Sequence, residues 1–236
     1  MPAYVTALQS LFHSHADPVA AASMKAYMRN QFEYLGIKTP QQCALLRAFI
    51  GEQGLPALED LGGILLELWA LPEREFQYAA LGLLGRFERQ LPAEFIDTIE
   101  TLLTSKSWWD TVDSLATHTV GIHFKCFPAV QDHTLPRWRR ADNVWLRRTC
   151  ILFQNKYKAD TDFDLLKAII CENLGSKEFF INKAIGWALR EYTRVDPEGV
   201  RTFVAATPLA PLSAREALKW LVRQEQRQAK KTVNPN

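Results

Sequence analysis

Apolar residues along the chain recur with the period of a helix rather than that of a strand. Leu45, Leu46, Phe49 and Ile50 share one helical face, and residues 163–170 repeat the same spacing. Short breaks rich in Gly and Pro separate such segments. A capping residue followed by proline or by Glu/Gln at the capping-box position predicts a helix start at three places. These are Thr39-Pro40-Gln41-Gln42, Asp196-Pro197-Glu198 and Ser213-Ala214-Arg215-Glu216, with Thr39, Asp196 and Ser213 as the N-caps. Because signals for strands are nearly absent, the pattern predicts an all-α protein.

Four of the predicted helices align as copies of one unit. Their equivalent aromatic positions are Phe76, Trp109, Trp145 and Phe180, which lie 33, 36 and 35 residues apart, and a fifth copy begins near Leu212. A helical unit that recurs at this length is typical of an α-solenoid of HEAT-like antiparallel helix pairs, whose second helices line a concave face. We expect one such domain over residues 1–223 and a flexible tail over residues 224–236.

Charge is distributed unevenly along the chain. The formal net charge is only +2, but residues 1–100 carry 7 Lys/Arg against 12 Asp/Glu, and residues 101–236 carry 21 against 14. Residues 137–158 alone contain seven basic residues and one acidic residue. This polarity favours a polyanion bound to a basic concave face. The alternative is a solvated positive helix surface with no partner.

The remaining composition indicates a soluble protein of the cytoplasm. No apolar run approaches the ~20 residues that a membrane span needs, and the N-terminus lacks a signal-type stretch. The four cysteines form no CxxC pair, so we expect reduced thiols. We expect a monomer without an obligate protein partner, associated with the nucleoid if the cell is prokaryotic.

The repeat register brings a set of chemically suited side chains onto one face. Asp113 lies four residues after Trp109, and Trp187 lies four residues after Lys183, so each pair shares a helix face. Arg148 falls in the intervening repeat. Two indoles, a carboxylate and two cations would suit neither a core nor a plain solvated surface.

Each of these residues also has a structural interpretation. Trp109 and Trp187 could be core residues, and we assign Trp108 and Trp145 to the core. Asp113 could form a bridge between repeats with Arg148. Lys183 and Arg190 could be ordinary solvated charges. Asp110 is expected near a helix start, where negative charge is favourable.

No metal or cofactor is expected. His118 and His123 are five residues apart and do not share a helical face, and His13 and His15 have no further ligands at zinc-like spacing. Motifs of zinc proteases, serine hydrolases and nucleotide-binding loops are missing from the sequence.

The segment Lys106-Ser-Trp-Trp-Asp-Thr-Val-Asp113 resembles the AlkD-type DNA alkylation repair glycosylases, which are solenoids of HEAT-like helix pairs. The resemblance extends over nearly the whole chain. It includes Asp142-Asn-Val-Trp-Leu-Arg-Arg148, Ile151-Leu-Phe-Gln-Asn-Lys-Tyr-Lys158 and Ser176-Lys-Glu-Phe-Phe-Ile-Asn-Lys-Ala-Ile-Gly-Trp-Ala-Leu-Arg-Glu-Tyr192.

This resemblance implies a function and roles for individual residues. It implies hydrolysis of the N-glycosidic bond of 7-methylguanine and 3-methyladenine in duplex DNA, for base excision repair. Asp113 would be the catalytic carboxylate, Trp109 and Trp187 the active-site indoles, and Arg148 the site arginine. Phosphate contacts are expected from Arg148 and from four further basic residues, Lys106, Lys156, Lys183 and Arg190. Because no lysine is placed as a Schiff-base nucleophile, we expect a monofunctional enzyme.

Two alternatives remain open on the sequence. The first is a non-catalytic helical-repeat scaffold that binds DNA or protein. The second is a hydrolase that acts through metal-bound water, against which the scattered histidines already count. Loss of base release on substitution of Asp113 would separate the glycosylase from the scaffold.

Overall fold

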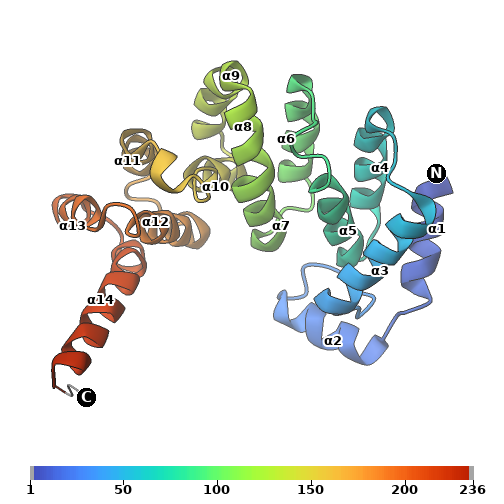
Figure 1. Ribbon diagram of the computed structural model, residues 1–236, viewed down its shortest axis with the longest axis horizontal. Helices are drawn as coiled ribbons and strands as arrows, with labels where there is room; N and C mark the ends of the chain where they lie inside the picture. The colour runs from blue at the N-terminus through green and yellow to red at the C-terminus, as the bar shows by residue number, and fades with distance from the viewer. Residues whose placement is uncertain (1–2, 234–236) are drawn as a thin grey trace. The chain divides into compact units, whose positions relative to one another are not determined.

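The computed structural model describes residues 3–233, with side chains through residue 227 (Figure 1). The chain divides into two compact units, Met1–Leu115 and Ala116–Asn236. Both units are built from helices. Among the described residues no strand forms, and an isolated bridge pairs Glu33 with Glu73. The predicted all-α fold is therefore confirmed.

In the first unit, successive helix pairs stack on one another. The helix α4 packs on α5 and α6, while α5 also packs on α7, so corresponding helices of neighbouring pairs are in contact (Figure 1). The helices α1 and α3 cover the start of this stack. The elements are α1 (Ala3–His13), α2 (Pro18–Tyr27), α3 (Thr39–Gln53), α4 (Leu58–Ala70), α5 (Arg74–Leu84), the 3-10 turn η1 (Ala93–Phe95), α6 (Ile96–Thr104) and α7 (Trp109–Ser114).

The second unit repeats this arrangement. The helices α10, α12 and α14 pack in series, and α9, α11 and α13 pack against them (Figure 1). A π-helical turn, η2 (Leu115–Val120), begins directly after α7. The other elements are α8 (Gly121–Cys126), α9 (Pro128–Arg139), α10 (Val144–Leu152), the 3-10 turn η3 (Lys158–Asp160), α11 (Phe163–Glu172), α12 (Phe179–Tyr192), α13 (Pro197–Ala206) and α14 (Pro211–Val233).

The aromatic positions of the predicted repeat lie on corresponding helices within the two units. Phe76, Trp109, Trp145 and Phe180 fall at or near the starts of α5, α7, α10 and α12, the second helices of successive pairs. The fifth copy near Leu212 begins α14. The fold is an α-solenoid, because each pair can bury its apolar stripe only against the next pair.

Apolar stripes at helical spacing supply the core. The helix α4 buries Leu61, Ile64, Leu65 and Leu68, which recur every three or four residues. In the second unit α12 and α14 approach closely at Gly186. A Cβ there would lie 2.6 Å from the Cβ of Glu216, so only glycine permits this crossing.

Several local predictions need correction. The helix α3 starts with Thr39 as its first residue, after Lys38, and α14 starts at Pro211, so neither Thr39 nor Ser213 is an N-cap. Asp196 does cap α13, accepting the amide of Gly199. Trp108 and Trp145 are half-buried rather than core. The buried indoles are those of Trp69 and Trp138, which are 2% and 0% exposed.

The predicted tail over residues 224–236 is helical up to Val233, as the last part of α14. Residues 234–236 lie outside the described residues. The flexibility of this segment stays a prediction.

Candidate functional site

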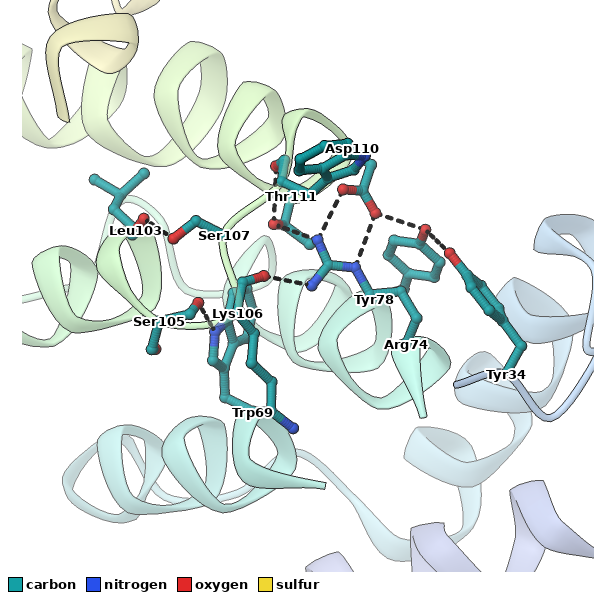
Figure 2. A network of polar contacts seen from close by, with 11 residues as sticks. Tyr34, Trp69, Arg74, Tyr78, Leu103, Ser105, Lys106, Ser107, Asp110 and Thr111 are labelled. Atoms are coloured by element: carbon teal, nitrogen blue, oxygen red, sulfur yellow. Dashed lines mark hydrogen bonds and ion pairs between the residues drawn. The ribbon is translucent and has the colours of Figure 1, made fainter. Parts of the chain in front are cut away.

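A buried ion pair fixes the start of α7. Arg74 of α5, which is 0% exposed, donates to both carboxylate oxygens of Asp110, at 2.9 Å from Nε and 2.7 Å from Nη2. The same guanidinium donates to the carbonyl of Lys106 at 2.8 Å and to the hydroxyl of Thr111 at 2.9 Å (Figure 2). The Tyr78 hydroxyl donates to Asp110 Oδ2 at 2.7 Å. A planar, bidentate pair of this kind sets both distance and orientation.

This network revises the interpretation of Asp110. Its carboxylate is within the first turn of α7, as expected from the sequence, but only 9% of the side chain is exposed. Its main partners are Arg74 and Tyr78 rather than the dipole of its own helix. Tyr78 also contacts the hydroxyl of Tyr34 at 3.3 Å (Figure 2). Burial, followed by the charge of Asp110, raises the pKa of Tyr78, so the phenol stays protonated and continues to donate.

The loop before α7 is held by further contacts. Lys106 adopts a left-handed backbone conformation, with φ at 47°, and its ammonium donates to the carbonyls of Ala70 and Leu71 at 2.8 and 2.5 Å. These carbonyls terminate α4, where a cation is favourable. Burial, together with the charge of Arg74, lowers the pKa of Lys106. Lys106 therefore has a structural role at this position, and a DNA contact from it stays a prediction.

Trp109 and Asp113 project from this fixed helix. They are one turn apart on α7, and both side chains are half-buried. The rings of Tyr27 and Trp109 pack in a T-shaped arrangement, with centroids 6.5 Å apart and planes at 74°. Trp109 is therefore half-buried rather than part of the fully buried core.

A pocket of about 590 Å³ lies beside Trp109 within the first unit. Aromatic and thioether side chains form much of its wall, and the lining residues include Asp110 but no lysine or arginine. Its lining comprises Ser23, Met24, Tyr27, Met28, Tyr34, Thr39, Gln42, Cys43, Leu46, Tyr78, Leu81, Gly82, Trp109, Asp110 and Ser114. Such a wall suits a flat or cationic group better than a phosphate.

Arg148 is placed in the second unit as a buried side chain. The residue is 3% exposed, and its Nη1 donates to the backbone carbonyl of Phe180. Its guanidinium carbon is 5.8 Å from the centroid of the Phe180 ring. These contacts tie α10 to the first turn of α12. Any DNA contact of Arg148 would come from a side chain with very restricted motion.

Two of the predicted DNA-binding cations share a partner on α14. Glu216 accepts from Lys183 at 3.1 Å and from Arg190 at 2.7 Å, and Lys219 lies at 3.7 Å from it. Burial opposes ionisation of Glu216, but the contact with Lys183 and the neighbouring positive charges outweigh it and lower the pKa of this carboxyl. The cluster keeps a net positive charge, because three cations surround one carboxylate.

Trp187 is half-buried on α12, between Lys183 and Arg190 in sequence. Its indole Nε1 donates to Glu191 at 3.3 Å. Lys156, the remaining predicted DNA-binding residue, is exposed after α10.

The structure therefore brings the predicted site residues together in two groups. Trp109, Asp113 and Lys106 belong to α7 and its preceding loop in the first unit. Trp187, Lys183 and Arg190 belong to α12 in the second unit, where Arg148 packs against the same helix. A common face for all of them, and its basic character, stay predictions.

Three residues that support the site were not predicted from the sequence. Arg74, Tyr78 and Glu216 do not belong to the predicted site, yet they hold the helices that carry it. One feature of the sequence could have indicated that Arg74 is buried. It lies two residues before Phe76, the aromatic position of its repeat, in a helix that is otherwise largely buried. Its partner Asp110 is 36 residues away, one repeat further along the chain.

The described residues form neither a metal-binding cluster nor a membrane-spanning helix. Over the described part of the chain, no three His, Cys, Asp or Glu side chains are grouped so that they could hold a metal ion. Within the same residues, none of the helices combines the length and apolarity required to span a bilayer.

Two comparisons with known proteins identify the family of the chain. The family model for "DNA alkylation repair enzyme" matches residues 8–221. A solved structure described as a "predicted DNA alkylation repair enzyme" from Enterococcus faecalis has 32% sequence identity and a TM-score of 0.81, over 87% of this chain and 96% of that chain. No curated protein matches the chain significantly.

The described residues form an all-α structure, and the matches associate the chain with DNA repair. The chain belongs to the DNA alkylation repair enzyme family.

Proposed function

We propose that this protein is a DNA glycosylase that releases cationic alkylated purines, 7-methylguanine and 3-methyladenine, from duplex DNA. The observation that carries the proposal is the pair Trp109 and Asp113 on one face of α7, a helix whose start is fixed by Arg74. An indole and a carboxylate held one turn apart can meet a cationic base and the sugar attached to it. The family of the chain supplies the context of alkylation damage.

The chemistry of the lesion needs such a carboxylate. Alkylation at N7 or N3 places positive charge on the purine and weakens the N-glycosidic bond. As this bond breaks, the deoxyribose acquires oxocarbenium character, which fixed negative charge stabilises. We assign this role to Asp113, which also orients the attacking water. The purine leaves as a neutral base with the electrons of the broken bond. The oxygen of water bonds to C1′, and its proton passes to Asp113 and then to solvent. The strand stays intact, as in a monofunctional enzyme.

The other residues are assigned to binding. The faces of Trp109 and Trp187 attract the cationic base and the sugar by cation–π and related contacts. Arg148 and the cations Lys156, Lys183 and Arg190 contact phosphates, so that affinity falls with salt. Glu216 supports this role of α12, because it orders Lys183 and Arg190 while leaving their surroundings positive.

The test is release of methylated bases from duplex DNA treated with a methylating agent, with products separated by chromatography. We expect the wild type to release cationic purines without breaking strands. Asp113→Asn should reduce the rate by at least about 100-fold, as for other fixed groups that stabilise transition-state charge. Affinity for an unmodified duplex should change little, because the substitution removes no cation.

Glu33→Gln is the matched control, since Glu33 belongs to an exposed ion pair with Lys25 in the same unit. It should leave base release unchanged. Wild-type rates in Asp113→Asn would refute the role of Asp113. Absence of base release by the wild-type protein, with DNA binding present, would support the scaffold alternative. Excess EDTA should have no effect, and its inhibition of base release would support metal-bound water instead.

A further inference from the structure

A second pocket, of about 310 Å³, lies wholly within the second unit and outside the residues assigned to catalysis. It lies among the segment after α10, the helix α11 and the C-terminal end of α12, which are neighbours in Figure 1. Its lining comprises Gln154, Asn155, Lys156, Lys158, Thr161, Leu166, Ala188, Glu191, Tyr192, Arg194 and Val195. The volume is at the lower end of the range of small-molecule sites, ~300–1,000 Å³.

Three cationic residues and one carboxylate line this pocket. Lys156, Lys158 and Arg194 are cationic, and Glu191 is the one carboxylate among the lining residues. The amide nitrogen of Asn155 is buried and has no hydrogen-bond partner. A buried donor without a partner is costly, and a ligand that brings an acceptor would satisfy it. The pocket thus offers net positive charge and an unused donor, which together fit an anion rich in acceptors.

Lys158, one of the three cationic lining residues, has an unusual backbone conformation. Lys158 has φ at 56°, in the left-handed region that favours glycine, asparagine or aspartate. A lysine there bears a conformational cost of about 1–3 kcal/mol that the surrounding structure must offset. Lys156 and Lys158 both belong to the lining of this pocket.

The rest of the wall is apolar. Leu166, Ala188 and Val195 contribute aliphatic surface, and Tyr192 is held by stacking on Phe163, with ring centroids 4.4 Å apart. A phosphate alone would leave this surface without contacts. A phosphate ester, whose sugar can pack on aliphatic and aromatic side chains, would use both parts of the wall.

We propose that this pocket binds a phosphate ester, with the phosphate on Lys156, Lys158, Arg194 and the Asn155 amide, and the attached sugar on the apolar wall. The ester can be a backbone phosphate of DNA, in which case the site extends the DNA-binding surface of the proposed glycosylase. It can also be a free nucleotide. The chemistry of recognition is the same for both sources.

Glu191 links this pocket to Trp187. One carboxylate oxygen accepts from the indole of Trp187 at 3.3 Å, and the other pairs with Arg194 at 3.4 Å. A phosphate that engages Arg194 competes with Glu191 for it. The hydrogen bond to the Trp187 indole then changes, so ligand binding should alter the fluorescence of this residue. Trp187→Phe should abolish that part of the signal.

The test uses the full chain and the double variant Lys158→Gln/Arg194→Gln. The control is Lys177→Gln/Arg215→Gln, which removes the same charge from two exposed positions of the same unit that do not line the pocket. Thermal unfolding confirms that both are folded. Binding of an unmodified duplex is measured by anisotropy at several salt concentrations, and binding of inorganic phosphate and of dAMP by calorimetry.

We expect the pocket variant to bind the duplex about tenfold more weakly than the control does. The slope of the logarithm of the binding constant against the logarithm of the salt concentration should be smaller in magnitude by about one to two. That result identifies the ester as a DNA phosphate. Loss of dAMP binding in the pocket variant alone identifies a free nucleotide as the ligand. If the pocket variant equals the control for duplex, phosphate and dAMP, the proposal is wrong. Because no base release is measured, these outcomes do not depend on whether the protein is a glycosylase.

Discussion

Removing the carboxylate of Asp110 should destabilise the protein strongly, although Asp110 is not assigned to catalysis. The substitution Asp110→Ala leaves Arg74 with its charge in a site where the residue is 0% exposed. The carbonyl of Lys106 and the hydroxyl of Thr111 would remain as partners, but neither carries a negative charge. The Tyr78 hydroxyl would lose its acceptor as well.

The magnitude follows from the burial of the pair. Breaking a buried ion pair by removing one partner costs about 3–5 kcal/mol, because the remaining charge is left uncompensated. For a domain of this size, 1 kcal/mol corresponds to about 2–4 °C in Tm, so Asp110→Ala should lower Tm by roughly 6–20 °C. The exposed pair Lys25–Glu33, whose side chains are 37% and 62% exposed, provides the contrast. Glu33→Gln should cost about 0–1 kcal/mol.

The assay is urea unfolding followed by circular dichroism, with a double-mutant cycle. Arg74→Met removes the charge from the other side, and Arg74→Met/Asp110→Ala removes both charges and closes the cycle. The double variant should be more stable than Asp110→Ala, since it leaves no uncompensated guanidinium charge in the buried site. Because Asp110 sets the start of α7, base release at 25 °C should also fall in Asp110→Ala.

Two results would refute this reasoning. A loss of less than about 1 kcal/mol in Asp110→Ala would mean that the pair behaves like an exposed one. A double variant whose loss equals the sum of the two single losses would mean that the two residues stabilise the fold independently.

Three further outcomes are expected. Gly186→Ala should destabilise by about 1–3 kcal/mol in urea unfolding, since its Cβ would lie 2.6 Å from that of Glu216. Gly63→Ala should stabilise the protein by about 0.5–1 kcal/mol, because a Cβ at this position inside α4 meets nothing within 4 Å. Equal changes in stability for the two substitutions would contradict the close approach of α12 and α14 at Gly186. The lowered pKa of Glu216 means that its ionised form stabilises the fold above pH 4.5 and that this contribution disappears as the pH falls through the folded-state pKa. Glu216→Gln should therefore cost more at pH 7 than at pH 3, and a pH-independent cost would exclude the pairing with Lys183. Burial raises the pKa of the Cys150 thiol, so Ellman's reagent should modify the three exposed cysteines in the native protein and Cys150 only after unfolding.

Much of the fold was predictable because it depends on local periodicity. Apolar residues three and four apart specify a helix and its buried face, as in Leu61, Ile64, Leu65 and Leu68 of α4. The spacing of Phe76 and Trp109 was sufficient to identify successive repeats. Helix ends were less predictable, because Ser213 resembles a cap and instead donates to the carbonyl of Asn182 on α12.

The sequence by itself determined the helical-repeat architecture, the pairing of Trp109 with Asp113 on one helix, and the polarity of charge. Only the tertiary structure showed that Asp110 is buried against Arg74 and that Glu216 orders Lys183 and Arg190. The reason is physical. Helix faces follow from spacings of three and four residues, whereas these ion pairs join side chains 26 to 36 residues apart, whose contact exists only after neighbouring repeats have stacked.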